Sequence, residues 1–333
     1  MSQLHLSIEE ISGKLTSLFV EAGLSEVDAE IISKNLILTE AGGIESHGIR
    51  MVLPHLKRVK EGKYNLTPSM KVLNSSPSFT VVDADNGVGM YTATKAMEIA
   101  IEEAEKYGMH TVFSRNANTF GAAFTYTKMA LDKGLIGVAF SNSPAAMAPW
   151  GGKKPLIGTN PISIAIPGEQ EGPILFDMAS SKVAKSKIGI AQKLGEDIPE
   201  GWALDKDGNP TTDPNCALSG TVLPLAEHKG YGLALCLDVL SGVISGAAFA
   251  DTVNKFYSSE QTQSGMNVGQ TFIAIDPKQV LGSEFYQKMD TYIRKIHSEE
   301  NVRYPGEGTV RNLKKSIRDG ILIDTEFVRI FED

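Results

Sequence analysis

The sequence predicts an α/β protein whose first part is a unit of helices. Two observations support this fold class. From Phe79 onward, short apolar runs typical of strands alternate with longer segments of helical periodicity. Before that point, the first 65 residues contain only helical patterns. A β-α-β-α-β alternation is typical of a central sheet with partly parallel strands that is covered by helices.

The composition narrows the class of function. The chain has 333 residues, of which 42% are hydrophobic and 22% charged, which is typical of a globular protein. A net charge of −8 argues against a broad nucleic-acid-binding surface. Only two cysteines occur, and the first residues carry neither a basic nor an apolar signal-peptide region, so we expect a cytoplasmic protein. The apolar stretch 231–250 is interpreted as a buried core helix rather than a membrane span.

The N-terminal helices have clear start and stop signals. Ser7 and Glu10 form the pattern of a capping box, and apolar residues then recur at helical spacing up to Gly23. A second helix is expected from Ser25 to the Gly42-Gly43 pair, and a third over 49–61. We therefore predict an N-terminal helical unit over residues 1–65.

The rest of the chain alternates between strands and helices. Strands are expected at 79–82, 111–113, 135–140, 162–166 and 174–176. Helices are expected at 91–107, 121–133, about 180–194, 228–248 and 279–298.

Several motifs that would identify a common cofactor or metal site are incomplete. Gly87 and Gly89 lie between a strand and a helix, but Thr92 occupies the third position of a dinucleotide fingerprint, so we interpret them as a turn. The acidic stretch 205–213 lacks the glycine and glutamate positions of a calcium loop and is interpreted as a polar turn. The six histidines form neither HxH nor HxxxH, so no metal site is expected.

Two histidine-containing segments have residue types suited to chemistry. In Ser46-His47-Gly48-Ile49-Arg50, the imidazole can exchange a proton and the guanidinium can bind a carboxylate; the alternative is a surface turn between helices. His228-Lys229 opens an apolar helix, where free backbone N–H groups and a lysine favour a phosphate; the alternative is a solvated helix cap. The turn Gly158-Thr159-Asn160-Pro161 offers a hydroxyl and an amide to a small polar ligand.

These motifs occur in order with several others. The matching stretches are Ser46–Gly48, Gly151-Gly152, Gly158–Pro161, Phe176–Ala179, Ile198–Asp205, Gly208–Pro214, His228–Leu233 and Tyr304–Glu307. With them, the chain resembles the malate/L-lactate dehydrogenase family of the second, non-Rossmann type. That family includes ureidoglycolate dehydrogenase, sulfolactate dehydrogenase, 2,3-diketogulonate reductase and piperideine-2-carboxylate reductase. Of these, ureidoglycolate dehydrogenase is the one that Asp238–Val243 and Asn267–Gln270 resemble most.

The resemblance implies an architecture and a cofactor. It implies a non-Rossmann nicotinamide-binding fold with a central mixed sheet, and a homodimer whose active site lies near the subunit interface. The cofactor is expected to be NAD, with NADP as the alternative. Residues 75–300 are then the α/β cofactor- and substrate-binding region, and residues 301–333 a C-terminal segment packing back on the cofactor site.

The resemblance also implies roles for individual residues. His47 matches the proton-donating histidine of the family, with Ser46 beside it in a relay. Arg50, Thr159 and Asn160 are expected to bind the substrate. The cofactor-binding positions are Ser143, Asp177, Met178, Ala179, Lys229, Gly306 and Glu307.

Two positions depart from the family pattern. Relatives commonly place the carboxylate-binding arginine four residues after the histidine, where this chain has Met51; Arg50 stands one residue earlier, about 100° away on a helix. Relatives usually carry histidine at the position of Thr119, so Thr119 is expected to occupy a catalytic position. A threonine can hydrogen-bond a substrate but does not titrate near neutrality.

The function expected from the sequence is an NAD(P)-dependent oxidoreductase. It would transfer a hydride between nicotinamide and C2 of a small 2-hydroxy or 2-oxo acid, such as malate, lactate or ureidoglycolate. One alternative is a cyclic imine reductase of the piperideine-2-carboxylate type. The other is a catalytically weakened cofactor-binding homologue, because of Thr119 and the displaced arginine.

Overall fold

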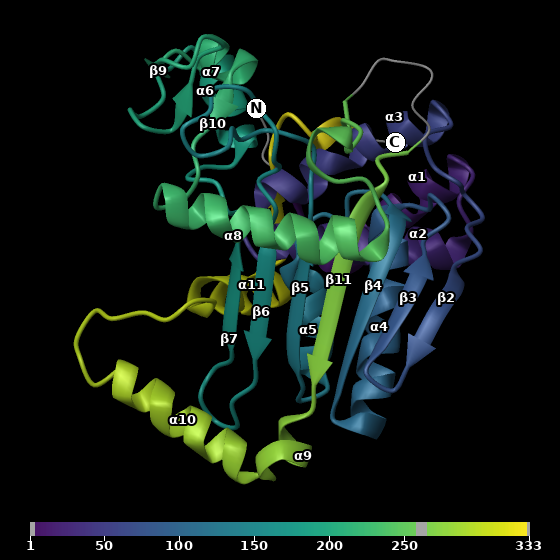
Figure 1. Ribbon diagram of the computed structural model, residues 1–333. Helices are drawn as coiled ribbons and strands as arrows, with labels where there is room; N and C mark the ends of the chain where they lie inside the picture. Colours follow the sequence, from purple (N-terminus) through teal and green to yellow (C-terminus); the bar gives the residue numbers. More distant parts are fainter. Residues whose placement is uncertain (1–3, 258–264, 332–333) are drawn as a thin grey trace.

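A seven-stranded mixed sheet forms the centre of the molecule (Figure 1). The computed structural model describes residues 4–257 and 265–331. In spatial order the strands are β2 (Lys71–Ser76), β3 (Phe79–Asp83), β4 (Met109–Ala117), β11 (Val268–Ile275), β5 (Ile136–Ser141), β6 (Ile162–Ile166) and β7 (Ile174–Met178). Only β3 and β4 pair in parallel, and every other neighbouring pair in this sheet is antiparallel. The predicted fold class is confirmed.

Helices cover both faces of the sheet. In Figure 1, α4 (Gly89–Tyr107) and α5 (Phe124–Asp132) lie behind the strands, and α8 (His228–Asp238) crosses in front of them. The inner side of α4 carries alanines, among them Ala96 and Ala100, which are fully buried. Small side chains let the helix pack close to Val112 of β4 and Phe272 of β11, which belong to the same core.

The N-terminal helices and the C-terminal segment share one hydrophobic core. The helices are α1 (Ile8–Glu21), α2 (Glu26–Ala41) and α3 (Val52–Lys60), and α3 follows two short 3₁₀ turns, η1 (Glu45–His47) and η2 (Ile49–Met51). The predicted capping box is present, with Glu10 N–H donating to Ser7 Oγ over 3.1 Å. Strand β1 (Leu4–Leu6) pairs with β12 (Ile321–Ile323), and α11 (Glu307–Asp319) packs against α2. The C-terminal 3₁₀ turn η5 (Val328–Ile330) completes this core.

Smaller elements lie at two ends of the sheet. A three-stranded sheet of β8 (Ala203–Leu204), β9 (Pro210–Thr211) and β10 (Thr221–Val222) packs with α6 (Lys185–Leu194) and α7 (Pro214–Ser219) around a core of its own. The polar stretch after Asp205 forms the turn between β8 and β9, where Asp205 accepts N–H bonds from Asp207 and Asn209. Helices α9 (Pro277–Leu281) and α10 (Glu284–Ile296) lie at the lower end in Figure 1, and η4 (Ala250–Thr252) follows α8.

Some expected elements differ in extent. Helix α5 begins at Phe124 and α6 at Lys185, each later than predicted, and Gly282, at φ +65°, separates α9 from α10. The predicted helix over 228–248 is α8 followed by a π-helical turn, η3 (Val239–Val243). Strands β2 and β11 and helix α11 were not expected.

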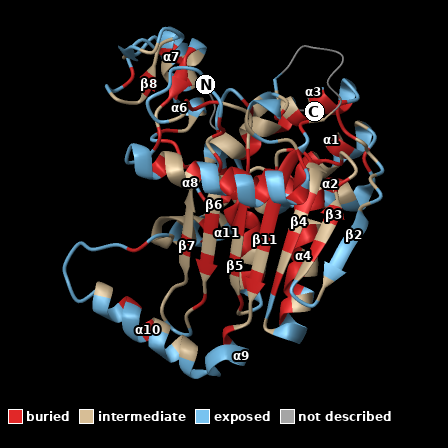
Figure 2. Ribbon diagram, in the orientation of Figure 1, coloured by how far each residue is buried: buried red, intermediate tan, exposed pale blue. Residues whose placement is uncertain are grey.

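The apolar stretch 231–250 is not the fully buried helix that the sequence indicated. Its outward side is about half exposed, with Leu235 at 44% and Val243 at 48% (Figure 2). Its one charged residue, Asp238, is buried and accepts hydrogen bonds from Asn142 Nδ2 and Ala250 N–H. Among the described residues, no helix is long and apolar enough to cross a bilayer.

Candidate active site

His47 is held in a 3₁₀ turn that is fixed to helix α2. The carboxylate of Glu40, near the end of α2, accepts the backbone N–H of Ile49 over 2.8 Å. Gly48 lies so close to α2 that a Cβ there would come within 3.0 Å of Glu40 Cα, so the turn requires a glycine. The Ser-His-Gly motif therefore presents His47 from a defined backbone position.

The imidazole of His47 is engaged on one side only. Ser46 Oγ lies 2.8 Å from Nδ1, and no described residue hydrogen-bonds Nε2. Partial burial lowers the pKa of His47 below its ordinary 6.5, so the neutral ring is the dominant form at neutral pH. A neutral imidazole whose Nδ1 is oriented by a hydroxyl can accept a proton at Nε2 from an alcohol, or return it.

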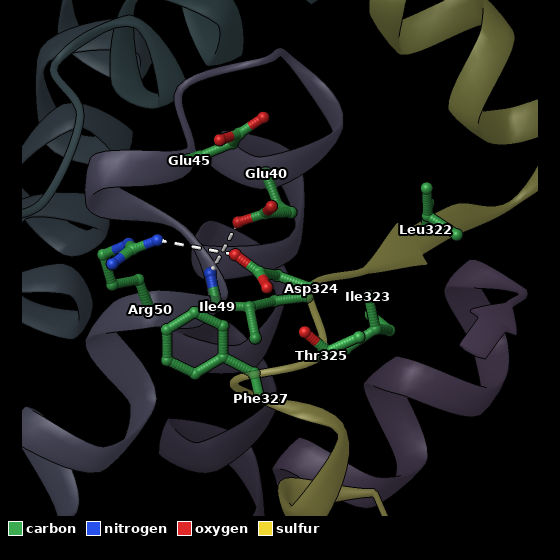
Figure 3. A pocket seen from close by; sticks show the side chains of 9 residues that line it. All are labelled: Glu40, Glu45, Ile49, Arg50, Leu322, Ile323, Asp324, Thr325 and Phe327. Atoms are coloured by element: carbon green, nitrogen blue, oxygen red, sulfur yellow. Dashed lines mark hydrogen bonds and ion pairs between the residues drawn. The ribbon is translucent and has the colours of Figure 1, made fainter. Parts of the chain in front are cut away.

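Arg50 points toward the C-terminal segment. Its guanidinium lies 3.7 Å from the carboxylate of Asp324 and stacks over Phe327 at 5.0 Å (Figure 3). It also lies 3.5 Å from the carboxylate of Glu326. Arg50, Asp324 and Phe327 line a cavity of about 310 Å³ that Glu40 also borders. The arginine expected to bind the substrate carboxylate is thus already bound by two carboxylates of the chain.

Thr119 follows the end of β4 and is half-buried. The preceding residue, Asn118, is fully buried and holds the surrounding loops together: its Nδ2 donates to the carbonyl of Gly87 over 2.9 Å, and its Oδ1 accepts Met266 N–H over 3.0 Å. A Cβ on Gly89 would overlap the backbone carbonyls of Asn118 and Thr119. The glycine turn therefore allows α4 to start against this loop, which explains Gly89 without a dinucleotide fingerprint.

The turn containing Thr159 and Asn160 is tied to the loop carrying Ser143. Asn160 Oδ1 accepts the backbone N–H of Ser143 over 3.0 Å, and its Nδ2 donates to the carbonyl of Ala234 in α8 over 2.9 Å. Ser180 donates to the carbonyl of Thr159. Both polar atoms of the Asn160 side chain are therefore used inside the chain, whereas Thr159 and Ser143 remain partly exposed.

Asp177, Met178 and Ala179 end strand β7 beside this turn. Asp177 Oδ2 accepts the backbone N–H of Phe124, the first residue of α5, over 2.9 Å. Burial raises the pKa of Asp177 to about 6. Met178 pairs with Ile162 on β6, so the strand end runs alongside the Thr159–Asn160 turn.

The remaining expected cofactor positions lie on two helices. Lys229 is exposed in the first turn of α8, whose start has no side-chain cap. Gly306 precedes α11 at φ +100°, and the neighbouring carbonyl of Pro305 accepts the N–H of Leu175 on β7 over 3.0 Å. Glu307 Oε1 lies 2.5 Å from His297 Nε2.

The expected site residues form two groups, and elements on both sides contact the start of α5. The first group, Ser46, His47 and Arg50, belongs to the N-terminal unit, and the second lies around the ends of β5 and β7. Asn35 of α2 donates to Thr125 over 2.8 Å, and Asp177 binds the adjacent Phe124. Sequence reasoning missed Glu40, Asn118 and Arg58. Asn118 directly precedes Thr119, which was singled out, and a buried arginine has no signal in the sequence.

The comparisons with known proteins decide the family. A family model described as malate/L-lactate dehydrogenase matches residues 6–331. The chain belongs to this family. It is therefore a dehydrogenase of the malate/L-lactate type, which acts on CH–OH donors.

Individual relatives cover nearly all of this dehydrogenase. An L-sulfolactate dehydrogenase of Methanocaldococcus jannaschii is 39% identical over 91% of this chain and 88% of the relative. A (2R)-3-sulfolactate dehydrogenase (NADP(+)) of Chromohalobacter salexigens is 34% identical over 90% and 89%, and a ureidoglycolate dehydrogenase (NAD(+)) of Escherichia coli is 31% identical over 99% and 96%. The solved sulfolactate dehydrogenase from M. jannaschii superposes with a TM-score of 0.90 at 36% identity, covering 98% of this chain and 95% of that one.

Proposed function

We propose that this dehydrogenase transfers a hydride between a nicotinamide cofactor, NAD or NADP, and C2 of a small 2-hydroxy or 2-oxo acid, and that His47 exchanges the proton on the substrate oxygen. The observation that carries the proposal is the His47 geometry: Ser46 occupies Nδ1, while Nε2 has no partner among the described residues. Family membership supplies the reaction class.

His47 acts as the acid or base. In the direction of alcohol oxidation, neutral His47 accepts the hydroxyl proton at Nε2, and Ser46 stabilises the resulting imidazolium by accepting a hydrogen bond from Nδ1–H. In the direction of reduction, the imidazolium returns the proton to the carbonyl oxygen. Glu40 contributes by fixing the turn, since its bond to Ile49 N–H determines where the imidazole lies.

The residues present fit a nicotinamide dinucleotide. The start of α8 lacks a side-chain cap and carries exposed Lys229, a combination suited to a phosphate. Ser143, Met178 and Ala179 are partly exposed at adjoining loop and strand ends, where they would hold the remainder of the group. When bound, the nicotinamide supplies or accepts the hydride. The relatives named for NAD(+) and NADP(+) leave both cofactors as candidates for this chain.

The substrate carboxylate has to be bound near His47. Arg50 becomes available to it only after the contacts with Asp324 and Glu326 break. Thr119 offers a hydroxyl in place of the imidazole expected in relatives. A smaller, uncharged group at this position leaves more room, which favours a bulkier or less acidic substrate than lactate.

We also propose that the protein is a homodimer formed through the outer side of α8 and η3. The exposed apolar residues on this side are Leu235, Val239, Leu240, Val243 and Ile244, each 44–51% exposed. Residues 235, 239 and 243 recur every four positions and so share one side of the helix. Soluble monomers rarely leave so continuous an apolar row uncovered, and two copies of one helix can cover each other about a twofold axis.

The activity is tested by a substrate panel. Purified protein is mixed with NADH or NADPH and with one test compound at a time: pyruvate, oxaloacetate, 3-sulfopyruvate or the cyclic imine piperideine-2-carboxylate. The loss of absorbance of the reduced cofactor is followed over time. The proposal expects turnover of at least one 2-oxo acid. Turnover of the imine alone, or of no compound with either cofactor, would contradict it.

Light scattering tests the dimer. Wild type is expected to have twice the chain mass, and Val239→Glu with Val243→Glu the single mass. Val280→Glu changes an equally apolar residue, 76% exposed on α9, and should stay dimeric. A monomeric wild type rules the dimer out.

A further inference from the structure

Arg58 is a buried cation that has no carboxylate partner among the described residues. Its side chain, on α3, is only 5% exposed. One terminal nitrogen donates to the carbonyl of Phe256 over 2.7 Å, the other lies 3.5 Å from Asn118 Oδ1, and Nε has no hydrogen-bond partner. Within residues 4–257 and 265–331, no carboxylate pairs with it. Arginine remains charged, and burying an unpaired charge is costly, so this position calls for an explanation.

Aromatic rings hold the guanidinium in place. It lies 4.9 Å from the ring centre of Tyr64 and 4.8 Å from that of Phe256. The same two rings contact His55, whose Nδ1 lies 2.8 Å from Tyr64 Oη. These contacts offset part of the cost of burial, but they do not neutralise the charge.

Arg58 lies on the side of the helix where relatives are expected to carry their substrate-binding arginine. Met51, His55 and Arg58 stand at spacings of four and three residues, so they share one side of α3 and the turn before it. Each contacts the 256–257 segment: Tyr257 Oη lies 3.9 Å from Met51 Sδ, and Phe256 contacts the other two. Burial, with Arg58 nearby, lowers the pKa of His55 to about 3, so Arg58 alone gives this side its charge at neutral pH.

Arg58 is also linked to the loop that carries Thr119. The link runs through Asn118, and Arg58 lies on α3, the helix that follows the turns with His47 and Arg50. Arg50, by contrast, is neutralised by Asp324 and Glu326.

We propose that Arg58 is a positioning residue whose charge, unpaired within the described part of the chain, attracts and orients the substrate carboxylate, a role that Arg50, paired with Asp324 and Glu326, does not fill. The inference rests on the proposed function. Because the side chain is nearly inaccessible, it acts through its field rather than by contact; a buried charge is screened less than an exposed one. The site should therefore prefer anionic 2-oxo acids over uncharged ketones of the same shape.

The test compares an acid with its uncharged counterpart. The probes are the 2-oxo acid that wild type reduces fastest in the panel above and its C1 carboxamide, both at saturating cofactor. Arg58→Gln keeps an amide donor for Phe256 and Asn118 but removes the charge. It should raise KM for the acid by about tenfold, with kcat and the carboxamide KM within about twofold of wild type. Arg58→Lys keeps the charge and should restore most of the preference for the acid.

The outcomes separate the possible explanations. Equal increases in KM for acid and carboxamide would show that Arg58 only supports packing, and would overturn the proposal. If Arg58→Gln does not fold, as judged by circular dichroism, Arg50→Gln still decides: the proposal expects it to keep most of the preference for the acid. Loss of that preference in Arg50→Gln assigns the role to Arg50. If wild type reduces no 2-oxo acid, the proposed function itself is wrong.

Discussion

Ser46 Oγ lies 2.8 Å from His47 Nδ1, so one hydroxyl determines which nitrogen of the imidazole is available for chemistry. The contact joins neighbouring residues, yet it depends on a distant one. Glu40, in the preceding helix, holds the turn through Ile49 N–H and lies against Gly48. Three features therefore set the geometry for the proposed proton exchange at Nε2: the end of α2, the glycine without a side chain, and the serine.

Replacing His47 should remove proton exchange without affecting the cofactor. His47→Ala is expected to lower kcat by about 10²–10⁴-fold, which is typical of losing a general acid or base. Cofactor affinity, measured by fluorescence titration, should stay within about twofold of wild type. A variant that keeps near-wild-type turnover would show that another group moves the proton.

The pH profile follows from the burial of His47. For alcohol oxidation the ring must be neutral, and burial lowers its pKa below 6.5. The value of kcat/KM should therefore decline as pH falls, with a midpoint below 6.5. This decline should be absent from the residual activity of His47→Ala. A midpoint above pH 7 in wild type would contradict the assignment.

Lys229 is expected to bind a cofactor phosphate at the start of α8. Lys229→Ala should weaken cofactor binding by about 1–3 kcal/mol, the contribution of a charge-assisted hydrogen bond. Lys288→Ala, which changes an exposed lysine paired with Glu284 on α10, is the matched control and should leave binding unchanged. Equal affinities of wild type and Lys229→Ala would refute the prediction.

The buried carboxyl of Asp177 should make stability depend on pH. Its pKa is raised to about 6 in the folded protein, above 3.8 in the unfolded chain, so the folded state binds the proton more tightly. Wild type should therefore gain about 2 kcal/mol of unfolding free energy, relative to Asp177→Asn, as pH falls from about 7 to 4. Urea unfolding at both pH values measures this gain. Asp132→Asn, on the exposed end of α5, should show no such difference from wild type.

Thr119 is expected to set substrate size and the number of ionisations. With threonine there, His47 is the one imidazole expected to titrate in the site near neutrality, so turnover should show a single neutral-range ionisation from the protein. Thr119→His should shift preference toward smaller 2-oxo acids and add a second ionisation. A wild type that already oxidises lactate well and shows two neutral pKa values would contradict this account.

Local signals in the sequence were sufficient for much of the fold. The Ser7 capping box, the Ser25 helix start and the short apolar runs of the strands depend on neighbouring residues, and the structure has them. The position of β11 between β4 and β5 was not predictable, because strand order is fixed by pairing between segments more than a hundred residues apart. The outer side of α8 was interpreted as core from the sequence, because apolarity alone does not distinguish the core from an exposed apolar surface.

In the candidate site, too, local motifs could be predicted from the sequence, whereas contacts between distant segments could not. The motif around His47 is visible in the sequence, because a serine, a histidine and a glycine are adjacent. The contact of Arg50 with Asp324 and Glu326 is not visible in the sequence. The two acidic residues lie about 270 positions later and come close to Arg50 only when β12 pairs with β1. The isolation of Arg58 is likewise a property of packing.

Hydride transfer to C2 is the central claim, and isotope transfer tests it most directly. Wild type is incubated with NADH or NADPH carrying deuterium at C4 of the nicotinamide and with the 2-oxo acid that it reduces fastest, and the product is examined by mass spectrometry and NMR. The account predicts one deuterium at C2 of the 2-hydroxy acid, formed far more slowly by His47→Ala. The label is placed in turn on each face of C4. The account would be contradicted if the product carried no deuterium in either case, or if no 2-oxo acid gave a product.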